Sequence, residues 1–171
     1  MRSSDQVIIS RGIDYEGQMG FGHGTIIHPE CSIRAESASI LFGEYNIIEE
    51  KVKILNRKPE ENLNPAQMVI GSYNLFEVGC FIEFCEIGSY NVFEHRAHIE
   101  PNCKIGNGCI VAAGVKVPSG TIVPDYTIVY GEGRTMKNIS TPEEMFKMNI
   151  KALAEVLVKC LQSSTMTPSN K

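Results

Sequence analysis

The chain has 171 residues, a formal net charge of −4 and a calculated pI of about 5.6. This acidic balance leaves no basic footprint for nucleic acid, and no apolar run approaches the ~20 residues that cross a bilayer. The length is sufficient for one domain with its own core. Met1–Ser10 lacks the long apolar segment of a signal peptide, so we expect no secretion signal.

An eight-residue phrase recurs along the chain. Its clear copies read FGEYNIIE, IGSYNLFE and IGSYNVFE, and they begin at Phe42, Ile70 and Ile87. A weaker copy begins at Phe21, and a degenerate one begins at Ile105. Small insertions and one deletion aside, one unit of about 18 residues explains the spacing, and such self-similarity indicates a solenoid.

A shorter pattern runs inside each repeat, because a branched aliphatic residue or Phe recurs at about every sixth position. We call these residues the comb: Phe21, Ile27, Ile33, Phe42, Ile48, Ile54, Ile70, Phe76, Ile82, Ile87, Phe93, Ile99, Ile105, Val111, Val117, Val123 and Val129. A period of six suits short strands with alternating inward residues and does not suit a helix of 3.6 residues per turn. Three such steps predict a triangular coil with the comb on its axis.

The remaining segments divide the chain further. Residues 1–20 match the repeat poorly, 21–131 form the predicted solenoid, and 162–171 form a polar tail that we expect to be disordered. The polar stretch 56–67 interrupts the comb, so we expect a loop at one corner, either a tolerated insertion or a partner contact. A helix is predicted over 141–161.

The start of this helix has a clear signature. Thr141 supplies a hydroxyl cap, Pro142 suits the first helical position, and Glu144 has capping-box spacing. Apolar residues then recur at helical spacing. We expect this face to cover a flank of the solenoid, with partner binding as the alternative. In the tail, Thr167 precedes a proline and is a candidate phosphorylation site.

Six cysteines are present, and no two of them form a CxxC pair, which disfavours a zinc site. They are Cys31, Cys80, Cys85, Cys103, Cys109 and Cys160. Four of them fall on the small inward position that follows a comb residue by four. We interpret them as reduced packing residues, because free cysteine behaves as a small hydrophobe.

The six-residue pattern resembles the hexapeptide-repeat family, whose fold is the left-handed parallel β-helix, over roughly 21–130. The handedness follows from the resemblance alone, because parallel crossovers are normally right-handed. The resemblance therefore implies a left-handed parallel β-helix of hexapeptide repeats with a C-terminal α-helix.

Two enzymatic classes in this family need a test. In γ-class carbonic anhydrases two zinc ligands have the spacing of His23 and His28. The other histidines, His95 and His98, lie three predicted turns away, roughly 15 Å at ~4.8 Å per turn, whereas zinc–nitrogen bonds are about 2.0–2.1 Å. Either of those two could act as the base of an acyltransferase, but no substrate-binding constellation accompanies them.

A closer resemblance is carried by Asn74–Cys80 and Ile128–Gly131, which look like the hexapeptide-repeat subunits of the dynactin pointed-end complex. That resemblance implies a non-enzymatic adaptor without cofactor or metal, located in the cytoplasm and at the cytoskeleton. It also implies pairing with the related dynactin subunit 5, and association with the pointed-end actin-related protein and a p62-type subunit. The implied role is the support of dynein–dynactin cargo targeting.

Three glutamates, Glu49, Glu77 and Glu94, follow the comb at the same place in their repeats. They should form a column on one face, and stacked like charges repel. We expect Lys51 and Arg96 to offset part of this repulsion. Either solvent and these cations suffice, or a basic strip of a partner binds the column.

Two further columns recur in the same repeats. Tyr45, Tyr73 and Tyr90 predict a packed aromatic row, with an interaction surface as the alternative, because aromatic residues are common interface anchors. Asn46, Asn74 and Asn91 predict a corner ladder of amides that bind the backbone.

Overall fold

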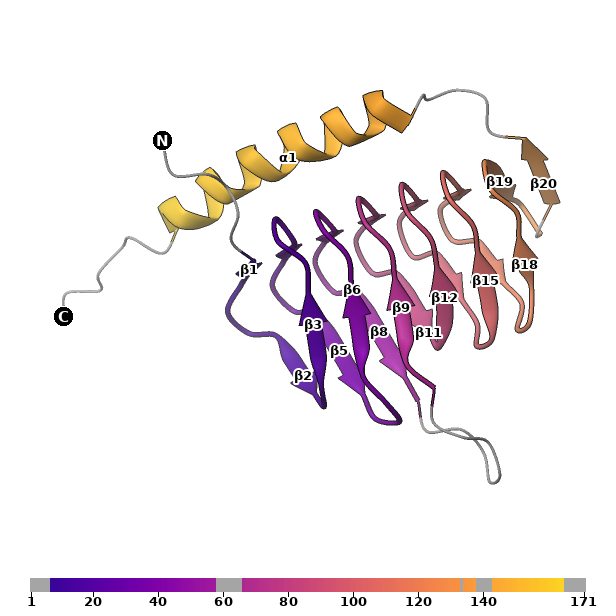
Figure 1. Cartoon of the computed structure of the whole chain (residues 1–171), viewed down its shortest axis with the longest axis horizontal. Helices are drawn as coiled ribbons and strands as arrows, with labels where there is room; N and C mark the ends of the chain where they lie inside the picture. Colours follow the sequence, from indigo (N-terminus) through magenta and orange to yellow (C-terminus); the bar gives the residue numbers. More distant parts are fainter. Residues whose placement is uncertain (1–6, 58–65, 133, 138–142, 165–171) are drawn as a thin grey trace.

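The structure is a computed structural model that describes residues 7–57, 66–132, 134–137 and 143–164. Within these residues, three β-sheets wind around one axis, and one helix lies along the outside of the coil (Figure 1). From β1 to β19, consecutive strands belong to different sheets, and each strand pairs with the strand one turn away in parallel register. The predicted solenoid is therefore a parallel β-helix.

The first sheet carries the helix and has eight strands. They are β1 (Ile8–Ile9), β4 (Ile26–Ile27), β7 (Ile47–Ile48), β10 (Leu75–Phe76), β13 (Val92–Phe93), β16 (Ile110–Val111), β19 (Thr127–Tyr130) and β20 (Arg134–Lys137). The last pair, β19 and β20, is antiparallel.

The second and third sheets have six strands each. The second consists of β2 (Asp14–Glu16), β5 (Ser32–Ala35), β8 (Lys53–Asn56), β11 (Phe81–Glu83), β14 (His98–Ile99) and β17 (Lys116–Val117). The third consists of β3 (Met19–Phe21), β6 (Ile40–Phe42), β9 (Met68–Ile70), β12 (Cys85–Ile87), β15 (Cys103–Ile105) and β18 (Ile122–Val123).

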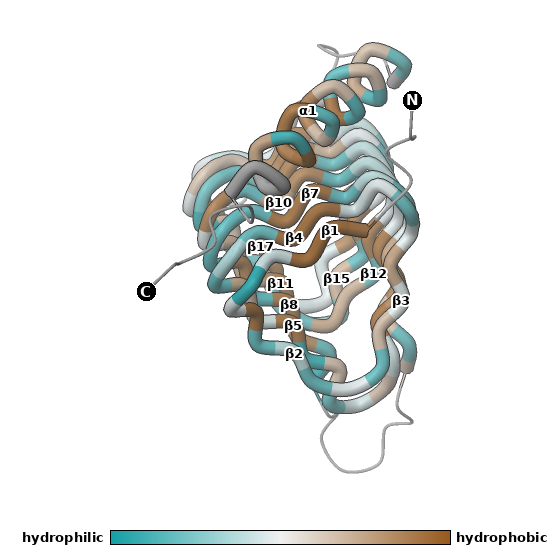
Figure 2. The backbone as a smooth tube through the Cα atoms, turned by 90° about the vertical axis from the view of Figure 1, so that its left-hand side faces the viewer, coloured by the Kyte–Doolittle hydropathy of each residue, from teal (hydrophilic) through white to brown (hydrophobic). Residues whose placement is uncertain are grey.

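The coil is left-handed. In Figure 1 the chain rises along the front strands β3 and β6, descends behind along β5 and β8, and advances from left to right. Figure 2, seen from the N-terminal end, shows the same sense of rotation as the coil recedes. The fold predicted from the hexapeptide resemblance is confirmed.

The comb lies on the axis, as its period predicts. Phe76 aligns with Ile48 on one side and with Phe93 on the other. The two phenyl rings stack with centroids 4.9 Å apart and planes 2° apart. The comb residues from Ile27 onward are buried, and they form one continuous core along the coil.

The asparagine ladder is also confirmed. Asn46, Asn74 and Asn91 are fully buried at the corner that leads into the first sheet. Side-chain oxygens of this column accept backbone N–H groups of the following turn, including that of Cys109. Each amide thus replaces a strand bond at a corner where the ladder stops.

Helix α1 (Glu143–Ser164) packs over the first sheet. Its Ile150 and Ala154 are 3% exposed and cluster with Ile26 and Ile47 of the solenoid. The helix therefore buries one apolar stripe against the flank of the coil, and no helix of the described residues is long and apolar enough to span a membrane.

Several boundaries differ from the sequence expectation. The segment 1–20, which we set apart, contributes β1, β2 and most of β3, and these strands form the first turn. Strand β8 ends at Asn56, while residues 58–65 of the predicted loop lie outside the described residues. Thr167, the cap at Thr141 and most of the tail lie outside them as well, so the division of the chain remains a prediction.

Five of the six cysteines are packing residues of the core. All except Cys160 are buried, and none of the six forms a disulfide. Inward thiols donate to carbonyl oxygens, for example Cys31 to Glu49 at 2.9 Å. Burial is the main cause that raises the pKa of the Cys31 thiol to about 11 and that of Cys80 to about 12.

Candidate interaction surfaces

The glutamate column is bonded to the backbone of the solenoid. A side-chain oxygen of Glu49 accepts the backbone N–H of Val78 at 3.1 Å. Glu77 accepts that of His95 at 3.0 Å, and Glu94 accepts that of Ala113 at 3.0 Å. Each carboxylate thus spans one turn and satisfies an N–H group at the corner where the first sheet ends.

These bonds change the electrostatic interpretation of the column. Partial burial raises the pKa of Glu49, with smaller contributions from the charges of Glu77 and Glu50. The expected cation Lys51 does not pair with the column, because its ammonium lies 3.7 Å from Glu30. Backbone N–H groups, instead of this lysine, offset the repulsion between the stacked charges.

Each histidine has a carboxylate neighbour. The Nδ1 atoms of His23 and His28 lie 3.2 Å and 3.0 Å from Glu44 and Glu50. The ring of His95 contacts Glu77 at hydrogen-bond distance. These pairs lie along the corners of the first sheet and link successive turns.

The fourth histidine lies on another face. His98 of β14 lies 3.1 Å from Glu83 through Nε2 and stacks on Phe81 with centroids 4.8 Å apart. Within the part of the chain that the structure describes, no three His, Cys, Asp or Glu side chains converge to hold a metal ion.

The tyrosine row has an unusual backbone. Tyr45, Tyr73 and Tyr90 have φ values of 53°, 60° and 64°, a region that non-glycine residues rarely adopt. The Tyr45 and Tyr73 rings stack with centroids 5.2 Å apart, and the Tyr90 ring follows at 5.7 Å. The left-handed corner thus directs three half-buried rings along one edge of the first sheet.

Helix α1 covers this row. Tyr45 and Tyr73 pack against the cluster that contains Ile150 and Ala154. The ammonium of Lys151 lies 5.1 Å and 5.7 Å from the centroids of these two rings, within cation–π range. The row therefore makes an intramolecular contact with the helix.

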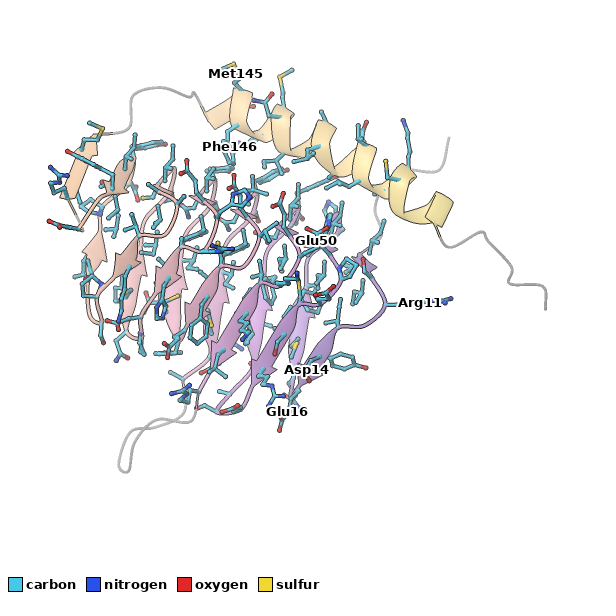
Figure 3. The ribbon with its side chains drawn as sticks, turned by 180° about the vertical axis from the view of Figure 1, so that it is seen from behind. Arg11, Asp14, Glu16, Glu50, Met145 and Phe146 are labelled. Atoms are coloured by element: carbon cyan, nitrogen blue, oxygen red, sulfur yellow. The ribbon has the colours of Figure 1, made fainter. Side chains whose placement is uncertain are left out.

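The outer face of α1 carries a second apolar stripe. Met145, Met148, Leu153 and Val156 are 48%, 70%, 38% and 55% exposed. Figure 3 shows Phe146 directed toward the solenoid and Met145 directed away from it. The helical spacing predicted one apolar face, and the structure shows that the helix is apolar on two.

A shallow depression of about 570 Å³ lies on the third sheet. Val69, Ile122 and the ion pair of Glu86 with Lys104 line its floor. The described side chains that line it include no histidine, so the candidate acyl-transfer bases lie elsewhere on the coil.

The left-handed parallel β-helix and the repeated residues at its corners define a hexapeptide-repeat protein. The family described as bacterial transferase hexapeptide (six repeats) matches residues 84–119. A hexapeptide transferase family protein from Anaplasma phagocytophilum superposes with a TM-score of 0.69 at 16% identity, covering 92% of each chain. For UDP-N-acetylglucosamine O-acyltransferase from Moraxella catarrhalis the TM-score is 0.53 at 18% identity, covering 90% of this chain and 77% of that one. Such low identity supports the fold alone.

Sequence identity to curated relatives identifies the family within the hexapeptide-repeat proteins. Dynactin subunit 6 of Nematostella vectensis is 32% identical over 130 residues, which is 73% of this chain and 71% of the relative. The Xenopus tropicalis and Danio rerio proteins of the same name are each 36% identical over 69% of this chain. The chain belongs to the dynactin subunit 6 family. It spans 61% and 64% of the length of the frog and zebrafish relatives.

Proposed function

We propose that this protein is a non-catalytic, structural subunit of dynactin, located in the cytoplasm and at the cytoskeleton. The observation that carries the proposal is the identity of 32–36% with proteins named dynactin subunit 6 over about 70% of the chain. The geometry agrees with a scaffold, because the glutamates and histidines that sequence patterns single out bind neighbouring turns.

Membership of the complex supplies the proposed partners. They are a relative of dynactin subunit 5, the pointed-end actin-related protein and a p62-type subunit, and the proposed role is the support of dynein–dynactin cargo targeting. The glutamate column is one proposed contact for a basic strip of such a partner, because its carboxylates remain half-buried at the surface. The tyrosine row contributes only where α1 leaves its edge accessible.

A pull-down from cytosolic extract with the tagged chain tests the proposal. Mass spectrometry should identify the actin-related proteins and other dynactin subunits. Recovery of no dynactin subunit above a tag-only control would overturn it, as would stoichiometric zinc in the purified protein or acyl transfer from a carrier.

The column is tested separately with the triple variant E49Q/E77Q/E94Q. Glutamine keeps an acceptor oxygen for each backbone N–H group, so the fold should persist while recovery of the complex falls. The matched control is E86Q/E132Q/E155Q, which removes the same number of carboxylates from exposed positions outside the column. Equal recovery with both variants would exclude the column as a contact.

A further inference from the structure

The outer face of the third sheet carries a row of exposed apolar side chains. Leu41, Val69 and Ile122 point outward from β6, β9 and β18 and are 40%, 46% and 70% exposed. Outward positions of successive turns lie above one another at about 4.8 Å per turn. In Figure 1 this sheet faces the viewer, and no other described element lies in front of it.

The outward positions of the other two sheets differ from this row. On the first sheet, Ile26 and Ile47 are fully buried beneath α1. On the second sheet, the outward positions of β8, β14 and β17 are Lys53, His98 and Lys116. The row of the third sheet is therefore apolar and uncovered, a property that is typical of interaction surfaces.

An ion pair interrupts the row. Glu86 of β12 and Lys104 of β15 lie between Val69 and Ile122, and their charged groups are 3.2 Å apart. Their side chains are 63% and 58% exposed. From β9 to β18 the face thus presents an apolar, an acidic, a basic and an apolar side chain, one per turn, and all four line the depression of about 570 Å³.

We propose that this face binds the same face of a second copy of the chain, with the two coils antiparallel. A two-fold axis that runs midway between β12 and β15, parallel to both, brings Glu86 of each copy opposite Lys104 of the other. The same rotation places Val69 opposite Ile122. A pairing of this kind makes every contact twice, because the order of the four side chains is complementary to itself.

Charge complementarity favours this occupant and this orientation. If the two coils were parallel, Glu86 would face Glu86 and Lys104 would face Lys104 across the two-fold axis, and such juxtaposed like charges are unfavourable. A partner of different sequence would need a cation opposite Glu86, a carboxylate opposite Lys104 and an apolar residue on either side. An antiparallel second copy presents these four groups in the required order.

The contact should be weak and reversible. A row of four positions is about 14 Å long at about 4.8 Å per turn, which is short for the roughly 800 Å² per partner of a standard interface. The opposite charges fix the register, and removal of Val69 and Ile122 from water supplies the stabilisation. This self-association goes beyond the proposed function and does not depend on it.

Three variants of the full-length chain test the face. Glu86→Lys leaves two cations at its centre, Lys104→Glu leaves two carboxylates, and Ile122→Glu removes an apolar contact. The matched control is Lys53→Glu, which reverses an exposed charge on the second sheet. All four substituted side chains are exposed, so circular dichroism should show an unchanged fold.

The measurement is sedimentation equilibrium over a wide range of protein concentration. The average mass of the wild type should rise from 18.9 kDa toward twice that value, and Lys53→Glu should match it. Each of the three face variants alone should weaken the dimer at least about tenfold. An equimolar mixture of Glu86→Lys and Lys104→Glu should dimerise again, because each cation of one variant then faces a carboxylate of the other.

The mixture separates the proposed contact from an ion pair that acts only within one chain. A mixture that stays monomeric would overturn the proposal, as would face variants that dimerise as well as the wild type. A wild type that remains at 18.9 kDa throughout, or that approaches three times this mass, would also overturn it. None of these results would alter the recovery of dynactin subunits on which the proposed function depends.

Discussion

The side-chain oxygen of Asn46 accepts two hydrogen bonds from Asn74, one from the backbone N–H and one from the amide, each at 3.0 Å. The amide of Asn74 also donates to the carbonyl of Gly88, and its oxygen accepts the N–H of Asn91. One fully buried side chain therefore serves three turns of the coil.

Replacing Asn74 with alanine should strongly destabilise the fold. The substitution leaves the buried N–H of Asn91 and the partly buried carbonyl of Gly88 without these partners, so the free energy of unfolding should fall by about 3 kcal/mol. Urea denaturation measures it. The control is Asn107→Ala, because Asn107 is a partly exposed corner amide that bonds Ser89 N–H. A loss no larger than the control's would contradict the structural role of the ladder.

Glu77 allows the hydrogen bond to be separated from the charge. Glu77→Gln keeps an acceptor for the N–H of His95, so stability should change by less than about 0.5 kcal/mol. Glu77→Ala removes the acceptor and should cost about 1 kcal/mol. Chemical denaturation of both variants distinguishes them, and equal stability would show that the backbone bond contributes nothing.

The docking of α1 depends on its inner stripe. Ile150→Ala deletes atoms that are packed against the solenoid, so we expect a loss of about 2 kcal/mol and faster hydrogen exchange in the helix. Met148→Ala is the matched control on the same helix, because Met148 is 70% exposed and its truncation should change stability by less than about 0.5 kcal/mol. Equal effects would mean that the helix is not held by this stripe.

The six-residue period predicted which side chains face the axis of the coil, because side-chain alternation follows directly from spacing. The repeat of about 18 residues predicted the stacking of the Tyr-Asn copies and the asparagine ladder. The comb also extends backward at the same spacing, to Tyr15 and Ile9. The first turn was missed because an aromatic residue with a hydroxyl interrupts the aliphatic series there. An extension by spacing alone would have found it.

Two other features could be recognised only in the three-dimensional structure. In the sequence, a column of glutamates indicates only repulsion between like charges. The structure shows that backbone N–H groups of the next turn donate to these carboxylates, as that of Val78 does to Glu49. The position of α1 over Tyr45 was equally hidden, because an amphipathic helix pattern does not specify which of three flanks it covers.

Stability should also depend on pH through Glu50. Its hydrogen bond with His28 holds the pKa of the Glu50 carboxyl below its usual value. Because the folded-state pKa is lowered, the contribution is present above the unfolded-state pKa and is lost as the pH falls through the folded-state value. Glu50→Gln should therefore destabilise the protein at pH 7, by no more than about 1 kcal/mol, and have little effect near pH 3.

Thermal melts from pH 3 to pH 7 measure this difference. Glu155→Gln on the exposed face of α1 is the control for net charge. A destabilisation by Glu50→Gln that persists undiminished at pH 3 would exclude the ionised Glu50 carboxylate as its cause.

Replacing a non-glycine residue by glycine at a left-handed corner of the coil should stabilise the protein. Glu30, Lys51, Gly79, Arg96 and Gly114 occupy one column of left-handed corner positions, with φ between 58° and 74°. A left-handed conformation costs a non-glycine residue roughly 1–2 kcal/mol, whereas glycine adopts it freely but adds about 0.4–1 kcal/mol of unfolded-state entropy. Lys51→Gly should therefore raise the free energy of unfolding by about 0.5 kcal/mol, even after loss of the exposed pair with Glu30.

The matched control lies two residues away. Lys53 is exposed in strand β8, where the backbone gains nothing from glycine, so Lys53→Gly should lower the free energy of unfolding by about 1 kcal/mol. The two variants remove the same side chain from neighbouring exposed positions, and their opposite signs isolate the backbone contribution. Equal destabilisation in urea denaturation would show that the corner conformation carries no strain that glycine can relieve.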